Sequence, residues 1–95
     1  VRKRVIRAYQ KQLDRAGKSN AELGPTEVDR HCQLASTERI LLEKAMKKLQ
    51  LSARAYHRIM KLARTIADID DCEHIQSPHI TEAISYRSLD RFINR

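Results

Sequence analysis

The sequence has few of the residues that make tight turns, aromatic cores or disulfide frameworks. Its 95 residues include two Gly, two Pro, one Phe, three Tyr, no Trp and two Cys. So few Gly and Pro argue against a turn-rich β-protein, and the dominant Ala, Leu, Ile, Arg, Lys and Glu favour helix. No apolar run approaches the roughly 20 residues of a membrane span. We therefore expect an all-α fold, a compact bundle of four to five helices.

The scarcity of glycine also limits the chemistry of the chain. With only Gly17 and Gly24, it cannot contain a GxxxxGK[ST] phosphate loop, a GxGxxG motif or a GxSxG motif. We expect no catalytic residue and no bound cofactor in this chain alone. Cys32 and Cys72 have no CxxC spacing, which favours a reducing cytoplasm over a disulfide framework.

Two groups of side chains resemble metal ligands without matching a metal site. Cys72, His74 and His79 follow no familiar zinc spacing, and we interpret them as surface or half-buried side chains. Three aspartates within residues 68–71 stand beside a predicted turn, and dispersed carboxylates there rarely form a Mg²⁺ cage. We interpret them as a solvated turn and predict no metal site.

Positive charge is concentrated in the first segment. Residues 1–20 hold seven Lys or Arg and one Asp, a net +6 of the formal +7 for the whole chain. Five cations recur every three or four residues on one face: Arg4, Arg7, Lys11, Arg15 and Lys18. The first four lie within the predicted first helix and have no acidic residue four positions away. Such unneutralised repulsion favours a polyanionic partner, nucleic acid ahead of membrane. These four residues are candidate DNA contacts, and a solvated helix face is the other interpretation.

Hydrophobic periodicity predicts one helical domain over residues 1–95. The first helix covers residues 1–16 and ends at a Gly17 cap. It should bury an apolar face at i, i+4 spacing, made of Val1, Val5, Tyr9 and Leu13. A polar connector over residues 20–25 leads into the core, residues 26–87, and the tail, residues 88–95, should be frayed. The chain begins at Val1 rather than Met, so we expect a fragment of a longer protein.

Four further helices are predicted inside the core. Their expected starts are Thr26, Ser36 or Thr37, Ser52 and Ser77, the last with Pro78 in the first helical position. The helix after Ser52 is the longest and reaches about Ile69, and the last helix ends near Arg87. Apolar residues cover about half of the circumference of the longest helix, so it should be the central one.

Three segments carry a resemblance to a known family. Residues 51–56 read LSARAY, residues 63–68 read ARTIAD, and residues 79–87 contain His-x-x-Glu-Ala followed by Tyr-Arg. Together with the first segment and residues 20–23, they resemble the C-terminal region of the magnesium-chelatase-like AAA+ ATPases of bacteria, the ComM/YifB family. Members often carry a Gly where the long helix ends, whereas this chain has Asp70-Asp71, which puts the local turn in question.

This resemblance implies that the chain is the helical lid following a nucleotide-binding domain, whose full-length protein is an ATPase that uses ATP and Mg²⁺. It implies a ring hexamer that acts in DNA branch migration, with the nucleotide-binding domain, neighbouring subunits and DNA as partners. The lid would supply a sensor-2 arginine to ATP phosphates, in cis or in trans. Arg54 matches that position, and Arg58 and Arg64 are weaker candidates, Arg64 because it can pair with Asp68.

Other interpretations remain open from the sequence. Arg54 could be a surface arginine of a structural helix. The whole chain could be a free-standing helical DNA-binding module, or a protein-interaction adaptor without a nucleotide role. A phosphate loop encoded upstream of Val1 separates the lid interpretation from both.

The missing glycine-rich motifs generate a first prediction. The purified 95-residue chain should be strongly helical and should not hydrolyse ATP, because nothing in it can cradle the phosphates. Release of inorganic phosphate from ATP measures this directly. Turnover above the level of a mock purification would contradict the prediction.

Overall fold

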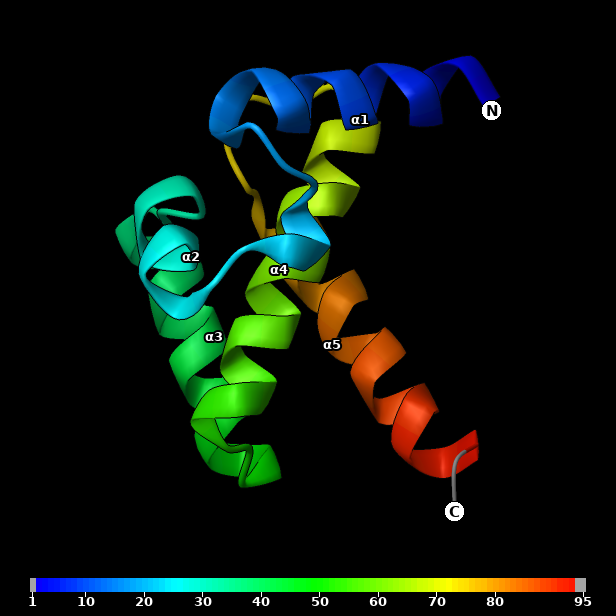
Figure 1. Cartoon of the computed structure of the whole chain (residues 1–95). Helices are drawn as coiled ribbons and strands as arrows, with labels where there is room; N and C mark the ends of the chain where they lie inside the picture. Colours follow the sequence, from blue (N-terminus) through cyan, green and yellow to red (C-terminus); the bar gives the residue numbers. More distant parts are fainter. Residues whose placement is uncertain (1, 94–95) are drawn as a thin grey trace.

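Five α-helices and one short 3₁₀ helix make up the described part of the chain (Figure 1). This computed structural model describes the backbone of residues 2–93 and the side chains of residues 3–86. The elements are α1 (Arg2–Ala16), η1 (Asn20–Glu22), α2 (Pro25–His31), α3 (Ser36–Leu49), α4 (Ala53–Ile69) and α5 (Ser77–Ile93). The described backbone contains no strand, which confirms the all-α prediction. None of these helices combines the length and the apolar character needed to cross a bilayer.

The central helix is α4, as its wide apolar arc predicts. It packs against α1, η1, α2 and α5, while α3 packs against α5. Small and aliphatic side chains of α4 are at most 3% exposed: Ala55, Ile59, Met60, Ala63 and Ala67. Leu42 of α3, Val28 of α2 and Ile80 of α5 complete the same cluster. The alanines allow neighbouring helices to come close to α4, which therefore positions α1, η1, α2 and α5 directly and α3 through α5.

Three helix ends follow their predicted signals. α1 ends at Ala16, and Gly17 has φ +74°, the left-handed conformation of a C-cap. α3 begins at Ser36. Ser52 is the N-cap of α4, and its Oγ accepts a hydrogen bond from the N–H of Ala55 at 3.2 Å.

The predicted cap of α2 is wrong. The N-cap is Gly24 rather than Thr26, because Pro25 occupies the first helical position, where its fixed φ suits the helix and its missing N–H leaves no donor unpaired. The Glu27 carboxylate accepts a hydrogen bond from the N–H of Gly24 at 3.0 Å. That bond, and a second one from the Lys18 ammonium, lower the pKa of Glu27. A Pro signal therefore outweighs a Thr signal at this helix start.

The last helix begins where predicted but has a different cap. The first helical hydrogen bond is accepted by the carbonyl of Gln76, whose own N–H donates to Nδ1 of His79 at 2.9 Å. His79 thus does the work that a glutamate does in a capping box. The predicted cap, Ser77, instead donates its hydroxyl to Glu38 of α3 at 3.4 Å.

The C-terminal boundary also differs from the prediction. α5 continues past Arg87 to Ile93, so the predicted end is too early, and residues 88–93 of the expected frayed tail are helical backbone. Residues 94–95 of that tail lie outside the described residues, as do the side chains beyond residue 86. The predicted core, residues 26–87, therefore stops short of the end of the last helix.

The turn after α4 keeps the shape that a glycine would give it. Asp71 has φ +60°, a left-handed conformation that Asp adopts more readily than most residues. The N–H of Cys72 donates to the carbonyl of Ala67 at 2.8 Å, and the N–H of Asp71 donates to that of Asp68 at 3.1 Å. These two bonds form a Schellman motif. Asp70-Asp71 therefore leaves the local turn intact.

The helix α1 crosses the C-terminal end of α4 with a different face from the one predicted (Figure 1). Ala8 and Gln12 are buried, whereas Val5 and Tyr9 are 49% and 50% exposed. Leu13 is half-buried. The remaining member of the predicted apolar face, at position 1, lies outside the described residues. The short side chain of Ala8 lets α1 approach α4 closely. The larger side chains of Val5 and Tyr9 face solvent.

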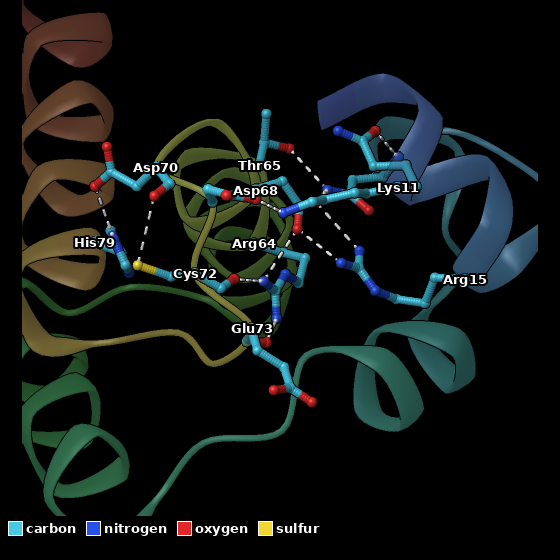
Figure 2. Close-up of polar contacts among 12 residues, drawn as sticks. Lys11, Arg15, Arg64, Thr65, Asp68, Asp70, Cys72, Glu73 and His79 are labelled. Atoms are coloured by element: carbon cyan, nitrogen blue, oxygen red, sulfur yellow. Dashed lines mark hydrogen bonds and ion pairs between the residues drawn. The ribbon is translucent and has the colours of Figure 1, made fainter. Parts of the chain in front are cut away.

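A buried carboxylate explains this orientation (Figure 2). The side chain of Asp68 is 0% exposed and accepts two hydrogen bonds from Arg15 of α1, at 2.7 and 3.2 Å. It also pairs with Arg64 at 3.0 Å and accepts a hydrogen bond from Nδ2 of Asn20 at 3.0 Å. The N–H of Asn20 in turn donates to the side chain of Gln12 at 2.8 Å. A single carboxylate therefore joins α1, η1 and α4.

The predicted pairing of Arg64 with Asp68 is confirmed, and it extends further than expected. Arg64 is 4% exposed and donates to the carbonyls of Cys72 and Glu73 at 2.8 and 2.9 Å. Its guanidinium thus fastens the turn after α4 to the same carboxylate (Figure 2). The interpretation of the aspartates as a solvated turn is wrong for Asp68, because two guanidinium groups and an amide replace water around it.

The second prediction concerns this carboxylate. Asp68→Asn should lower the free energy of unfolding by about 3–5 kcal/mol, because it leaves two guanidinium groups, one of them buried, without their counter-charge. Asp14→Asn is the control, since Asp14 accepts a hydrogen bond from Gln10 on the exposed side of α1. It should change stability by less than about 0.5 kcal/mol. Urea unfolding, monitored by circular dichroism, measures the free energy of unfolding of both variants. A change for Asp68→Asn as small as that for Asp14→Asn would rule out a central role for Asp68.

Candidate functional site

Basic side chains from the N-terminal half of α4 line an open hollow. It measures about 450 Å³, and its lining consists of Arg54, His57, Arg58 and Lys61 with Leu23 and Pro25. The four α4 residues stand at i, i+3, i+4 and i+7, so they share one helix face. The lining contains no Asp or Glu. Positive charge therefore gathers on the walls of the hollow, which suits an anion.

Arg54 is the side chain of the hollow with the greatest freedom to bind a ligand. It is exposed, and within residues 3–86 it makes no hydrogen bond or ion pair. It lies in the first turn of α4, two residues after the Ser52 cap, where unpaired N–H groups and the helix dipole add positive potential. Arg54 is therefore an exposed side chain at the start of the central helix, and no carboxylate among residues 3–86 pairs with it.

The other candidate arginines differ in their availability. Arg58 is exposed and lines the hollow one turn after Arg54, whereas Arg64 is buried in the network around Asp68. The structure therefore supports the ion-pair interpretation of Arg64. Sequence reasoning did not single out Lys61, which donates to the carbonyls of residues 21 and 23 at 3.3 and 3.4 Å and so fixes the rim of the hollow. The sequence does contain a signal for Lys61, because it lies two helical turns after Arg54 on the same helix face.

The basic face of α1 lies against the acidic end of α4. Three of the four candidate DNA contacts are in ion pairs with aspartates: Arg4–Asp70 at 3.4 Å, Arg15–Asp68 at 2.7 Å, and Lys11–Asp71. Arg4 also donates to the carbonyl of Ile69 at 3.1 Å, at the negative end of the helix dipole. The hydrogen bond from Lys11 lowers the pKa of Asp71. Arg7 remains exposed and makes no ion pair with any described side chain.

These pairs overturn the inference that repulsion along the basic face of α1 is unneutralised. The partners come from a different helix rather than from positions four residues away along α1. Because carboxylates already neutralise Arg4, Lys11 and Arg15, repulsion along the stripe no longer requires an external polyanion. Contact between α1 and DNA stays a prediction. The electrostatic argument for it is weaker than the sequence alone indicates, because fewer cations lack a counter-charge.

The cysteine and histidine side chains make bonds of their own. His79, 3% exposed, pairs through Nε2 with Asp70 at 3.0 Å, and its Nδ1 is engaged by the α5 cap (Figure 2). The Sγ of Cys72 lies 3.8 Å from the carbonyl oxygen of Asp70. Within the part of the chain that the structure describes, no group of three or more His, Cys, Asp or Glu side chains is placed to hold a metal ion.

Known proteins are similar to this chain over nearly all of its length. The family described as "Magnesium chelatase, subunit ChlI C-terminal" matches residues 1–87. The chain belongs to this family. It is 45% identical over all 95 residues to the competence protein ComM of Haemophilus influenzae, covering 19% of ComM. It is 43% identical over 93 residues to YifB of Escherichia coli, covering 98% of this chain and 18% of YifB. The chain thus spans about a fifth of the length of these relatives.

The segments that indicated this chelatase-type family have separate structural tasks. Residues 51–56 supply the cap of α4 and bring Arg54 to the hollow. Residues 63–68 supply Arg64 and Asp68 to the buried network. His79 closes the start of α5. The segments that resemble the family therefore include residues that build the fold as well as residues of the candidate site.

The third prediction tests whether α1 contacts DNA. If it does, binding to duplex DNA should be weak, insensitive to sequence and steeply salt-dependent, and neutralising Arg4, Arg7 and Lys11 together should flatten the salt slope by about two to three units. Fluorescence anisotropy over a salt series gives the slope, and circular dichroism checks that the fold persists. Neutralising three exposed lysines of α3 is the charge-matched control: Lys44, Lys47 and Lys48. Equal slopes for the parent and the α1 variant would contradict DNA contact.

Proposed function

We propose that this chain is the lid of a magnesium-chelatase-like AAA+ ATPase and that Arg54 binds a phosphate of ATP held by another domain or subunit. The observation that carries the proposal is an exposed arginine, without a partner among the described side chains, in a cationic hollow at the start of the central helix. Membership of the ChlI C-terminal family and the likeness to ComM and YifB support it.

The chemistry of the hollow suits an anion that carries several negative charges, such as a polyphosphate. A guanidinium presents a planar fork of N–H donors that matches two phosphate oxygens, and Arg54 makes no bond within residues 3–86 that must first be broken. Arg58 and Lys61 extend the positive lining over two further turns, and His57 lies between them and Arg54, which suits an anion of several phosphate groups. ATP with its Mg²⁺ is such an anion, and the glycine-rich loop and acidic residues that would hold it belong to the nucleotide-binding domain.

The fold gives Arg54 a rigid base. α4 has the Ser52 cap at one end and the Asp68 network at the other, and the other helices pack around it. A phosphate that draws Arg54 closer would therefore move the lid as one body rather than one side chain. In this way the lid would sense bound ATP and transmit its state around a ring of subunits. The similarity to ComM, a competence protein, supports DNA as the ultimate substrate of such a ring.

The fourth prediction applies to the full-length protein. Arg54→Ala should reduce kcat for ATP hydrolysis by one or more orders of magnitude, since one phosphate-stabilising donor contributes about 2.7–4 kcal/mol by analogy with an oxyanion-hole donor. Arg54→Lys should recover only part of the activity, because an ammonium cannot fork onto two oxygens.

Two controls separate this role from a structural one. Arg30→Ala, which removes an exposed arginine of α2 outside the hollow, should leave ATPase activity unchanged. Arg54→Ala should alter the free energy of unfolding by no more than about 0.5 kcal/mol. Normal hydrolysis by the Arg54→Ala protein would exclude the sensor role and return Arg54 to a surface residue of a helical interaction module.

A further inference from the structure

An apolar face of α1 is exposed to solvent. Among the described residues, five large apolar side chains are substantially exposed, and three of them belong to α1: Val5 at 49%, Ile6 at 61% and Tyr9 at 50%. At 100° per residue these three fall within about 100° of the circumference of the helix. They therefore form one continuous strip, referred to below as the α1 strip, rather than scattered surface residues.

The buried network holds the α1 strip in its exposed position. To bury Val5 and Tyr9, α1 would have to roll about its axis. Rolling would pull Arg15 away from the buried carboxylate of Asp68, to which it donates at 2.7 Å, and would take Gln12 from the N–H of Asn20. The polar contacts of one face therefore keep the apolar face outward, and the exposure is a property of the fold.

Charge borders the α1 strip. Lys3 and Arg7 are exposed and make no ion pair with described side chains, whereas Arg4 and Lys11 turn toward aspartates at the end of α4. In Figure 1 the N-terminal end of α1 extends beyond the last turn of α4. The strip thus offers an apolar centre with cations at its margin, and its complement is an apolar patch edged by carboxylates.

We propose that the α1 strip docks on the portion of the same polypeptide that precedes this domain, through an apolar patch edged by Asp or Glu. The family is a C-terminal one, and about four-fifths of ComM and of YifB lie outside the matched region. The strip is on the first helix, next to the point where such a preceding domain joins. A second copy fits less well, because a two-fold contact would bring Lys3 and Arg7 of both copies together. The inference rests on the proposed function for the existence of that domain.

The fifth prediction tests this docking in the full-length protein by thiol labelling. Ile6→Cys introduces a thiol into the strip, and Ile40→Cys introduces one at a matched isoleucine of α3 that is 51% exposed. Burial raises the pKa of the Cys32 thiol to about 11 and keeps it unreactive, so the parent background from this domain comes from Cys72. The thiol at position 6 should react with a maleimide at least about ten-fold more slowly than the thiol at position 40.

The conditions of labelling identify what covers the strip. Slow labelling at position 6 that persists on dilution to single subunits, without lipid, supports docking within one polypeptide. Equal rates at positions 6 and 40 would overturn the inference. So would protection that disappears on dilution, which indicates a neighbouring subunit, or protection that requires anionic vesicles, which indicates a membrane. Tyr9→Cys repeats the test at a second site of the strip.

The same protein separates this inference from the proposed function. In an Arg54→Ala background, slow labelling at position 6 should persist, because Arg54 lies in the first turn of the helix whose far end carries α1. Slow labelling together with normal ATP hydrolysis would retain the docking and remove the sensor role. Fast labelling at position 6 together with lost ATP hydrolysis would retain the sensor role and remove the docking.

Discussion

The architecture depends on one carboxylate buried between two guanidinium groups. Removing Asp68 from water carries a desolvation cost of several kcal/mol, which its ion pairs and hydrogen bonds with Arg15, Arg64 and Asn20 offset. Such a cluster contributes less to net stability than an apolar core of equal volume would, but it tolerates very few arrangements of its members. A core of small aliphatic side chains alone would leave α1 several similar ways to lie on α4. The ion pairs select one of them.

The helices and most of their ends could be predicted from local signals. Ser52, Gly17 and the apolar arc of α4 act within a few residues, and each is confirmed. Where two local signals competed, the prediction was wrong, as at Gly24 and Thr26, because Pro25 outweighs a threonine cap. His79 was missed as a capping residue, since capping patterns are defined by carboxylates and amides rather than imidazole.

The packing of α1 could not be predicted, for a different physical reason. Its apolar periodicity was real, but the contacts that decide its orientation join residues far apart in sequence, 53 positions for Arg15 and Asp68 and 60 for Lys11 and Asp71. Periodicity within one helix measures amphipathic character and not which face meets a neighbour. The candidate site shows the same limit. Arg54 came from a family resemblance, whereas Leu23 and Pro25 join it only through the path of the connector.

The helix α4 links the hollow at its start to α1 at its end. The first turns of α4 line the hollow, and α1 crosses the last turn of α4. With 17 residues at 1.5 Å each, the two ends of α4 are about 25 Å apart. A rigid rod of that length that pivots by about 10° about its Ser52 end displaces its far end by about 4 Å. Such a displacement is comparable with the width of an apolar side chain. Because the Asp68 network ties α1 to this far end, α1 would move with it, and α4 would behave as a lever arm.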